Sequence, residues 1–285
     1  MPDTSPAPAC AAPAATPASI AFIGGGNMAS ALMGGLIAQG FAPTQIEVVE
    51  PSEAARDALQ AQFGITAQPL PGPQLRSASL VVWAIKPQVF REAALQARLL
   101  TSEALHLSVA AGIRSSSIAQ WLGSERIVRA MPNTPALIGK GISGLFARKA
   151  VDAAERQRIE QLMAPTGETL WVEQEHDLDA VTALSGSGPA YVFYVLEAMT
   201  RAGVDMGLSE AQAHRLAVAT FAGAAELARR SDDPPEVLRQ RVTSKGGTTH
   251  AAIETLERAG VAGHFVHAME AAQLRARELG DEFGT

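Results

Sequence analysis

The stretch IAFIGGGNMASALMGGLIAQG, residues 20–40, is the strongest local indication of fold in this chain. An apolar run leads into three consecutive glycines, and a helical pattern with Ala29 near its start follows, which gives the spacing GxGxxA. In a dinucleotide-binding βαβ unit, such glycines allow a tight turn and let backbone amides approach a pyrophosphate at the helix N-terminus. An ordinary glycine turn is the alternative, but the strand before it and the βαβ alternation after it favour a nucleotide site. The residues assigned to the nucleotide here are Gly24, Gly25, Gly26, Asn27 and Met28.

Outward from this stretch, the chain alternates short apolar runs with helical patterns up to about residue 172. The helical patterns include residues 28–39 and 52–63. Continuous apolar strands separated by helices predict an α/β fold, a doubly wound parallel sheet of the Rossmann type. Two later runs, ISGLFAR and ETLWV, flank a helix over 152–163 and are expected to extend the sheet. The earlier strands read SIAFIG, IEVVE, LVVWAI, LHLSVAA and RIVRA.

The rest of the chain has few strand-like runs and many Ala-rich helical ones, such as EAQAHRLAVATFAGAAELARR. Small residues in long helices suit close helix–helix packing. Runs such as FYVLEAM carry apolar residues on more than one face, so these helices are expected to need a partner. We therefore divide the chain into a Pro/Ala-rich tail at 1–18, expected to be disordered, a Rossmann domain at 19–175 and an all-helical domain at 176–285.

Composition argues against several classes of partner and site. The net charge of -6 gives no reason to expect nucleic acid or an anionic membrane, and no apolar run approaches the roughly 18 residues of a membrane span. The single cysteine, Cys10, leaves no disulfide framework, and the tail lacks the basic start and apolar stretch of a secretory signal. His264 and His267 lie one turn apart, but no Cys, Asp or Glu at ligand spacing completes a metal site. We expect a cytoplasmic protein without a metal.

Six stretches stand out along the chain: FIGGGNMASALMGGL, AIKPQ (84–88), SVAAGI (108–113), RAMPNTPALIGKG (129–141), ALSGSGPAYVFYVLEAM (183–199) and SKGGTTHAAIETLE (244–257). Together and in this order, they resemble the pyrroline-5-carboxylate reductases. The resemblance implies a Rossmann domain and a helical domain that binds substrate and forms a homodimer through interleaved helices. It also implies reduction of the cyclic imino acid 1-pyrroline-5-carboxylate to L-proline, the last step of proline biosynthesis. Many members of the family assemble further into a pentamer of dimers.

The segment SKGGTT, residues 244–249, stands directly before an amphipathic helical pattern, far along the chain from the glycine loop. Its glycines can turn backbone amides outward and its hydroxyls lie at a helix start, which predicts a small anion cradle. A capped helix would account for only one glycine and one hydroxyl. The resemblance makes the substrate carboxylate the ligand, although Lys245 stands where a proline is common in the family. The residues assigned to the substrate are Ser244, Gly246, Gly247, Thr248 and Thr249.

Thr182 precedes ALSGSGPAY and matches the family threonine whose hydroxyl faces the imine nitrogen. The resemblance therefore makes it the catalytic residue. Without the resemblance, Thr182 reads as a helix threonine that bonds to its own backbone.

Glu50 ends the second predicted strand, where an acidic side chain accepts hydrogen bonds from the adenine-ribose hydroxyls of NAD. Many members of the family carry a small or polar residue there, so the cofactor is left open between NADP and NAD. Arg56, one helical turn on, is the nearest candidate for a 2′-phosphate, although a surface role is the simpler interpretation. Loops after the later strands are expected to line the nicotinamide half. The remaining cofactor residues assigned are Ser52, Ala84, Lys86, Pro87, Ala110 and Asn133.

Two other functions are compatible with parts of this pattern. A dehydrogenase of the β-hydroxyacid type would share the Rossmann sheet and the helices, but it relies on a catalytic lysine in its helical half. Here the only lysine beyond Lys149 is Lys245, inside the predicted cradle. A nucleotide-sensing or scaffold protein without turnover would be expected to lose the cradle first, and SKGGTT is intact.

Overall fold

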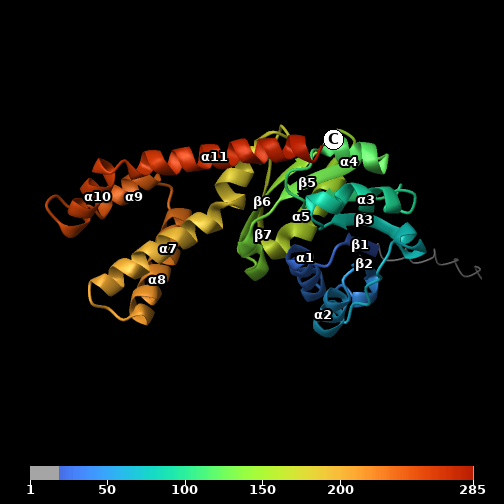
Figure 1. Ribbon diagram of the computed structural model, residues 1–285, viewed down its shortest axis with the longest axis horizontal. Helices are drawn as coiled ribbons and strands as arrows, with labels where there is room; N and C mark the ends of the chain where they lie inside the picture. The colour runs from blue at the N-terminus through green and yellow to red at the C-terminus, as the bar shows by residue number, and fades with distance from the viewer. Residues whose placement is uncertain (1–18, 285) are drawn as a thin grey trace, which may run out of the picture.

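The computed structural model describes residues 19–284, so the predicted disordered tail, with Cys10, lies outside the described residues. A sheet and the helices that cover it form one part of the molecule, and long helices extend away from it (Figure 1). The strands are β1 (Ser19–Ile23), β2 (Ile46–Val49), β3 (Ala78–Trp83), β4 (Leu105–Ser108), β5 (Ile127–Met131), β6 (Gly141–Ala147) and β7 (Gly167–Trp171). The helices between the strands are α1 (Asn27–Ala38), α2 (Glu53–Phe63), α3 (Pro87–Ala97), α4 (Ser115–Leu122) and α5 (Ala153–Met163). The later helices are α6 (Asp177–Val181), α7 (Gly188–Asp205), α8 (Glu210–Arg230), α9 (Pro235–Arg241), α10 (Thr248–Arg258) and α11 (Val261–Glu282).

The sheet has seven strands in the order β2-β1-β3-β4-β5-β6-β7, and β1 to β5 pair in the parallel sense, as the sequence predicts. β6 departs from the predicted pattern, because it pairs with β5 in the antiparallel sense. Residues 132–140 between these strands hold only a short 3₁₀ turn, η3 (Thr134–Ile138). Parallel neighbours need a crossover of about a dozen residues or more, so this connection is too short for one. β7 pairs parallel with β6, since α5 supplies such a crossover.

The sheet is buried on both faces, which explains why its strands read as continuous apolar runs. On one face, Phe22 and Val82 belong to a core that includes side chains of α1 and α5. On the other face, Ala21, Val81 and Trp83 belong to a second core with α3 and α4. Because helices cover both faces, a ligand can reach the sheet only at the ends of its strands. In such sheets the ligand lies beyond the carboxyl ends of the strands.

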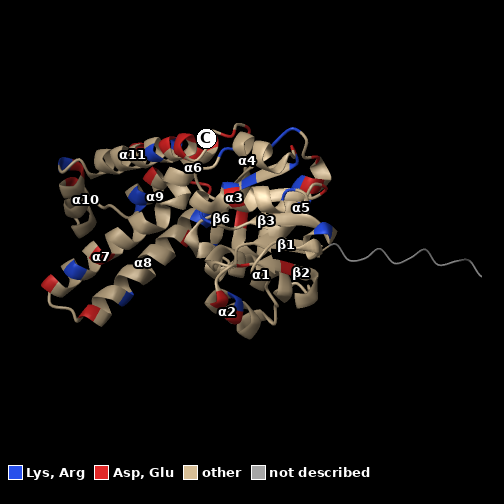
Figure 2. Cartoon of the chain, turned by 45° about the vertical axis from the view of Figure 1, so that its right-hand side comes forward, with Lys and Arg blue, Asp and Glu red and all other residues tan. Residues whose placement is uncertain are grey.

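The helices after β7 bury little of their apolar surface within one chain. α7 has 18 residues, of which only Gly203 is buried, and Phe193 and Tyr194 are 57% and 73% exposed. Residues 188–196 and 216–225 include no Lys, Arg, Asp or Glu, so long parts of the α7 and α8 ribbons are tan in Figure 2. Extended apolar faces of this kind are typical of surfaces that another protein chain covers. Among the described residues, no helix has the length and apolarity that a membrane span requires.

Candidate active site

The glycine loop joins β1 to α1 at the carboxyl edge of the sheet. Gly24 has φ +99°, and a Cβ atom there would lie 2.4 Å from the carbonyl oxygen of Ala84, so only glycine fits. Gly26 is the N-cap of α1 and has open space around its Cα. With no side chain capping this end of α1, its first amides are available to an anion, as a dinucleotide pyrophosphate requires.

Glu50, directly after β2, is bound to the same loop. Its Oε2 atom accepts a hydrogen bond from the amide of Gly25 at 2.8 Å, and its Oε1 atom accepts one from the amide of Ser52 at 2.8 Å. Ser52 is also the N-cap of α2, where its hydroxyl accepts from the amide of Ala55. The Nη1 atom of Arg56 donates to the carbonyls of Glu50 at 3.0 Å and Pro51 at 2.7 Å, so Arg56 also ties the end of β2 to α2.

A groove of about 520 Å³ brings several of the predicted cofactor residues together. Glu50 lies on one side of it, and the loop after β3, which continues into α3 with Pro87 at the first turn, lies on the other. Met28, in the first turn of α1, and Asn27, which begins that helix, adjoin the same loop. The predicted cofactor residues among its lining are Gly24, Gly26, Glu50, Ala84 and Lys86.

Two further loops at this edge carry Ala110 and Asn133. Ala110 follows β4, is 5% exposed, and donates its amide to the hydroxyl of Ser108 at 3.3 Å. Asn133 follows β5, where its Oδ1 atom accepts from the amide of Ile142 at 3.0 Å and its Nδ2 atom donates to the carbonyl of Ser185 at 3.2 Å. Asn133 therefore ties the start of β6 to the turn that follows Thr182.

Thr182 begins that turn, the π-helical segment η5 (Thr182–Gly186) between α6 and α7. Its hydroxyl donates to the carbonyl of Leu178 at 2.7 Å, which is the backbone-bonded geometry expected without the family resemblance. Tyr191 donates its hydroxyl to the carbonyl of Ala183 at 3.1 Å. A π turn leaves carbonyls without their usual helical partners, so Asn133 and Tyr191 supply hydrogen bonds that the turn lacks. Such turns are frequent at functional sites.

The predicted cradle lies elsewhere. Gly246 has φ +75°, and Gly247 is the N-cap of α10 without a side-chain cap, so the helix-capping interpretation of these hydroxyls does not hold. The carbonyl of Ser244 accepts a hydrogen bond from the amide of Gly247 at 3.0 Å. Thr248 and Thr249 form the first turn of α10. Figure 1 places α9 and α10 at the opposite end of the molecule from β1. One chain therefore does not bring the 244–249 segment to the glycine loop.

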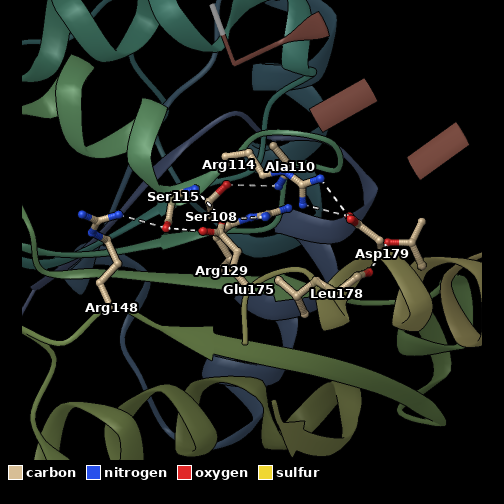
Figure 3. Close-up of polar contacts among 10 residues, drawn as sticks. Ser108, Ala110, Arg114, Ser115, Arg129, Arg148, Glu175, Leu178 and Asp179 are labelled. Atoms are coloured by element: carbon tan, nitrogen blue, oxygen red, sulfur yellow. Dashed lines mark hydrogen bonds and ion pairs between the residues drawn. The ribbon is translucent and has the colours of Figure 1, made fainter. Parts of the chain in front are cut away.

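A cluster of charged side chains that the sequence did not reveal joins the sheet to α6, the first of the helices α6 to α11 that form the arm of the molecule (Figure 3). Glu175 accepts from the amide and hydroxyl of Ser115 at 2.5 and 2.7 Å, and from Nη1 of Arg129 at 2.7 Å. Arg114 and Asp179 form a second pair. The partners are 46 to 65 residues apart in sequence, so no local pattern could have shown them.

The electrostatics of this cluster follow from burial and pairing. Burial by itself raises the pKa of the Glu175 carboxyl, but the charge of Arg129 and the hydrogen bonds from Ser115 outweigh it, and the pKa is lowered. Burial lowers the pKa of Arg129, and Glu175 opposes that change. The hydrogen bond from Arg114 to Asp179 raises the pKa of that guanidinium. Among the described residues, no group of three or more His, Cys, Asp and Glu residues is placed to hold a metal ion.

Comparisons with known proteins agree with this arrangement. A sequence family described as pyrroline-5-carboxylate reductase dimerisation matches residues 175–279. Another, described as NADP oxidoreductase, coenzyme F420-dependent, matches residues 19–112. The pyrroline-5-carboxylate reductase of Pseudomonas aeruginosa is 43% identical over 267 residues, which cover 93% of this chain and 98% of that protein.

Solved structures give the same result. A pyrroline-5-carboxylate reductase from Coxiella burnetii has a TM-score of 0.86 and 38% identity, covering 93% of this chain and 99% of that one. The Plasmodium falciparum reductase, solved with NADP bound, has a TM-score of 0.82 and 27% identity, covering 93% of this chain and 98% of that one. The predicted order of a nucleotide-binding α/β domain and dimerisation helices is confirmed. The chain belongs to the pyrroline-5-carboxylate reductase family.

Proposed function

We propose that this chain reduces 1-pyrroline-5-carboxylate to L-proline by hydride transfer from NADPH or NADH. The observation that carries the proposal is the hydrogen bond from Asn133 to the carbonyl of Ser185. It holds the turn of Thr182 at the sheet edge where the glycine loop opens, so a nicotinamide and an imine can meet there. Family membership favours this function over a β-hydroxyacid dehydrogenase and over a scaffold without turnover.

The reaction requires few catalytic side chains. A nicotinamide held at the glycine loop would supply a hydride to C5 of the imine, whose nitrogen must carry a proton. Because the Thr182 hydroxyl donates to Leu178, it has only lone pairs to offer a ligand. It can therefore accept from the N–H of the protonated imine and fix the orientation of the ring. In this mechanism Thr182 orients an iminium ion that is already protonated, and it transfers no proton itself.

The cofactor part of the proposal rests on the groove between the glycine loop and α3. The amides at the start of α1 would hold the pyrophosphate, and Glu50 and Ser52 would border the adenine ribose. Ala84, Lys86 and Pro87 after β3, Ala110 after β4 and Asn133 after β5 would line the nicotinamide half.

The substrate carboxylate is assigned to the free amides and hydroxyls at the start of α10. Since this segment lies far from the glycine loop of its own chain, we propose that each site takes the 244–249 segment from a second copy. The dimerisation family that matches residues 175–279 and the exposed apolar faces of α7 and α8 support a homodimer. A pentamer of dimers is part of the proposal, as are the domain limits 19–175 and 176–285. We also propose a cytoplasmic location, which agrees with the single cysteine of the chain, since a reducing compartment does not support disulfides.

The test is an assay of NAD(P)H oxidation by the full chain with pyrroline-5-carboxylate and with 2-oxo acids, beside an assay of NAD(P)+ reduction with 3-hydroxy acids. We expect turnover with the cyclic imine and none above background with the acids. Turnover of a hydroxy acid would favour the dehydrogenase alternative. Binding of NAD(P)H without turnover of any substrate would favour the scaffold alternative.

A further inference from the structure

Arg114 joins two segments that border the proposed site. It stands four residues beyond Ala110, directly before α4, and its guanidinium pairs with Asp179 of α6 in a bidentate manner (Figure 3). The Nη1–Oδ1 distance is 2.9 Å and the Nη2–Oδ2 distance is 3.0 Å. The side chain of Asp179 is 7% exposed and that of Arg114 is 21% exposed. Two parallel hydrogen bonds between planar groups fix relative orientation as well as distance.

The end of α11 closes over this pair. A Cβ atom on Gly280 would lie 2.6 Å from Nε of Arg114, so the guanidinium packs against α11 at a place where only glycine leaves room. Gly112 has φ +71°, and a Cβ atom on it would lie 3.0 Å from Cβ of Leu279. Ser117 donates its hydroxyl to the carbonyl of Gly284 at 2.8 Å. The loop from Ala110 to Arg114 is thus held between α6 and α11.

The segments joined in this way are those that must meet during the reaction. Asp179 lies three residues before Thr182, and α6 ends at Val181, immediately before the π turn. We infer that Arg114 is a positioning residue for the reduction, because its pair with Asp179 sets the place of Thr182 relative to the nicotinamide loop that contains Ala110. This inference rests on the proposed function for the roles of Thr182 and Ala110.

A purely stabilising role explains the pair less well. A buried ion pair roughly breaks even in stability against apolar residues of similar volume, so the burial of Asp179 beside the partly exposed Arg114 is weak evidence for stabilisation. The connection between sheet and arm is already held by Glu175, which binds Arg129 and Ser115. What the second pair adds is a fixed orientation of α6, since two hydrogen bonds oppose its rotation.

The experiment compares Asp179→Asn and Arg114→Lys with a matched control, Glu125→Gln, in the full chain. Glu125 also pairs with an arginine of this region, Arg148, but its side chain is 63% exposed and lies outside the proposed site. Each variant is assayed for kcat, for both KM values, and for the isotope effect with NADPH deuterated at the transferred position. Hydrogen exchange of residues 108–117 and 177–186 is measured on the same samples.

We expect Asp179→Asn to lower kcat by about tenfold and raise the isotope effect, with the cofactor KM within about twofold of the unchanged chain. Arg114→Lys keeps the charge but loses the bidentate geometry, so its kcat should be intermediate. Both variants should exchange amide hydrogens faster in the two segments than Glu125→Gln does. If Asp179→Asn does not fold, Arg114→Lys decides the question by the same readings.

An unchanged kcat and isotope effect in both folded variants, with only a lower unfolding temperature, would overturn the positioning role. Failure of the proposed function has a different signature, since the unchanged chain and Glu125→Gln would then both lack turnover of pyrroline-5-carboxylate. In that case the hydrogen-exchange rates alone test whether the pair of Arg114 and Asp179 holds the loop in place. Exchange equal to that of Glu125→Gln would mean that the pair does not hold the loop.

Discussion

At the scale of single residues, Glu50 links the glycine loop to the place where cofactor choice is made. Its carboxylate is fixed by the amides of Gly25 and Ser52, so it stays beside the loop even though it is only half-buried. A carboxylate there can accept hydrogen bonds from ribose hydroxyls but repels a 2′-phosphate. At a partly solvated site the repulsion is on the order of 1–2 kcal/mol.

We therefore expect Glu50→Ser to shift the ratio of the kcat/KM values for NADPH and NADH toward NADPH by about tenfold. Glu53→Ser is the matched control, since it removes an exposed carboxylate from the first turn of α2. Steady-state kinetics with both cofactors measure the shift. The same ratio in both variants would mean that Glu50 does not face the ribose.

Thr182 is the second residue whose role can be tested alone. Thr182→Val removes the lone pairs offered to the imine nitrogen, and kcat should fall by up to about 10²-fold, the scale for losing one transition-state contact. Thr182→Ser keeps the hydroxyl and the bond to Leu178, so it should retain most of the activity. A valine variant as active as the serine variant would remove Thr182 from the mechanism.

At the scale of secondary structure, α4 depends on a residue far from it in sequence. Its N-cap position, Arg114, supplies no side-chain cap, and Glu175 takes that place by binding Ser115. The same carboxylate neutralises Arg129, which is 6% exposed. Removing one partner of a buried ion pair leaves an uncompensated charge, which typically costs about 3–5 kcal/mol.

Glu175→Gln should lower the free energy of unfolding on that scale at neutral pH, whereas the exposed control Glu173→Gln should not. The pKa of Glu175 is lower in the folded chain than its ordinary value, so its contribution is present above the unfolded pKa and is lost as pH falls through the folded pKa. Urea unfolding between about pH 6 and pH 3 should thus show a difference in the free energy of unfolding between the two variants. This difference should become smaller as pH falls. A difference in the free energy of unfolding that does not change with pH would contradict a stabilising role of the ionised Glu175 carboxylate.

At the scale of the whole molecule, the apolar faces of α7 and α8 and the distant cradle both call for a second chain. We expect no folded monomer in a sedimentation experiment at micromolar concentration, because helices with such exposed apolar faces need a partner. Phe193→Glu places a charge on one of these faces, where the side chain is 57% exposed, and should weaken association. A folded, monomeric unchanged chain would contradict the prediction.

The shared site has its own test. A chain with Gly24→Val, which blocks the glycine loop, and a chain with Thr249→Val, which weakens the cradle, should each show low activity. Reassociating the two by dilution from mild urea forms mixed dimers in which one of the two sites is intact. We expect recovery of about a quarter of the unchanged activity if symmetric subunits exchange at random. No recovery in verified mixed dimers would place each site within one chain.

Elements that depend on near neighbours along the chain could be predicted from the sequence alone. The glycine loop with its strand and helix, the Ser52 cap of α2 and the start of α5 at Asp152 follow from local backbone and capping preferences. The motifs in the sequence also identified the family.

Features that depend on contacts between distant residues became apparent only in the folded chain. These include the antiparallel entry of β6, the bond from Asn133 to the π turn, and the pairing of Arg114 with Asp179. The distance between the 244–249 segment and the glycine loop belongs with them (Figure 1). This is because burial, ion pairing and strand order depend on which segments meet in space, whereas a local pattern indicates only the preferences of neighbouring residues.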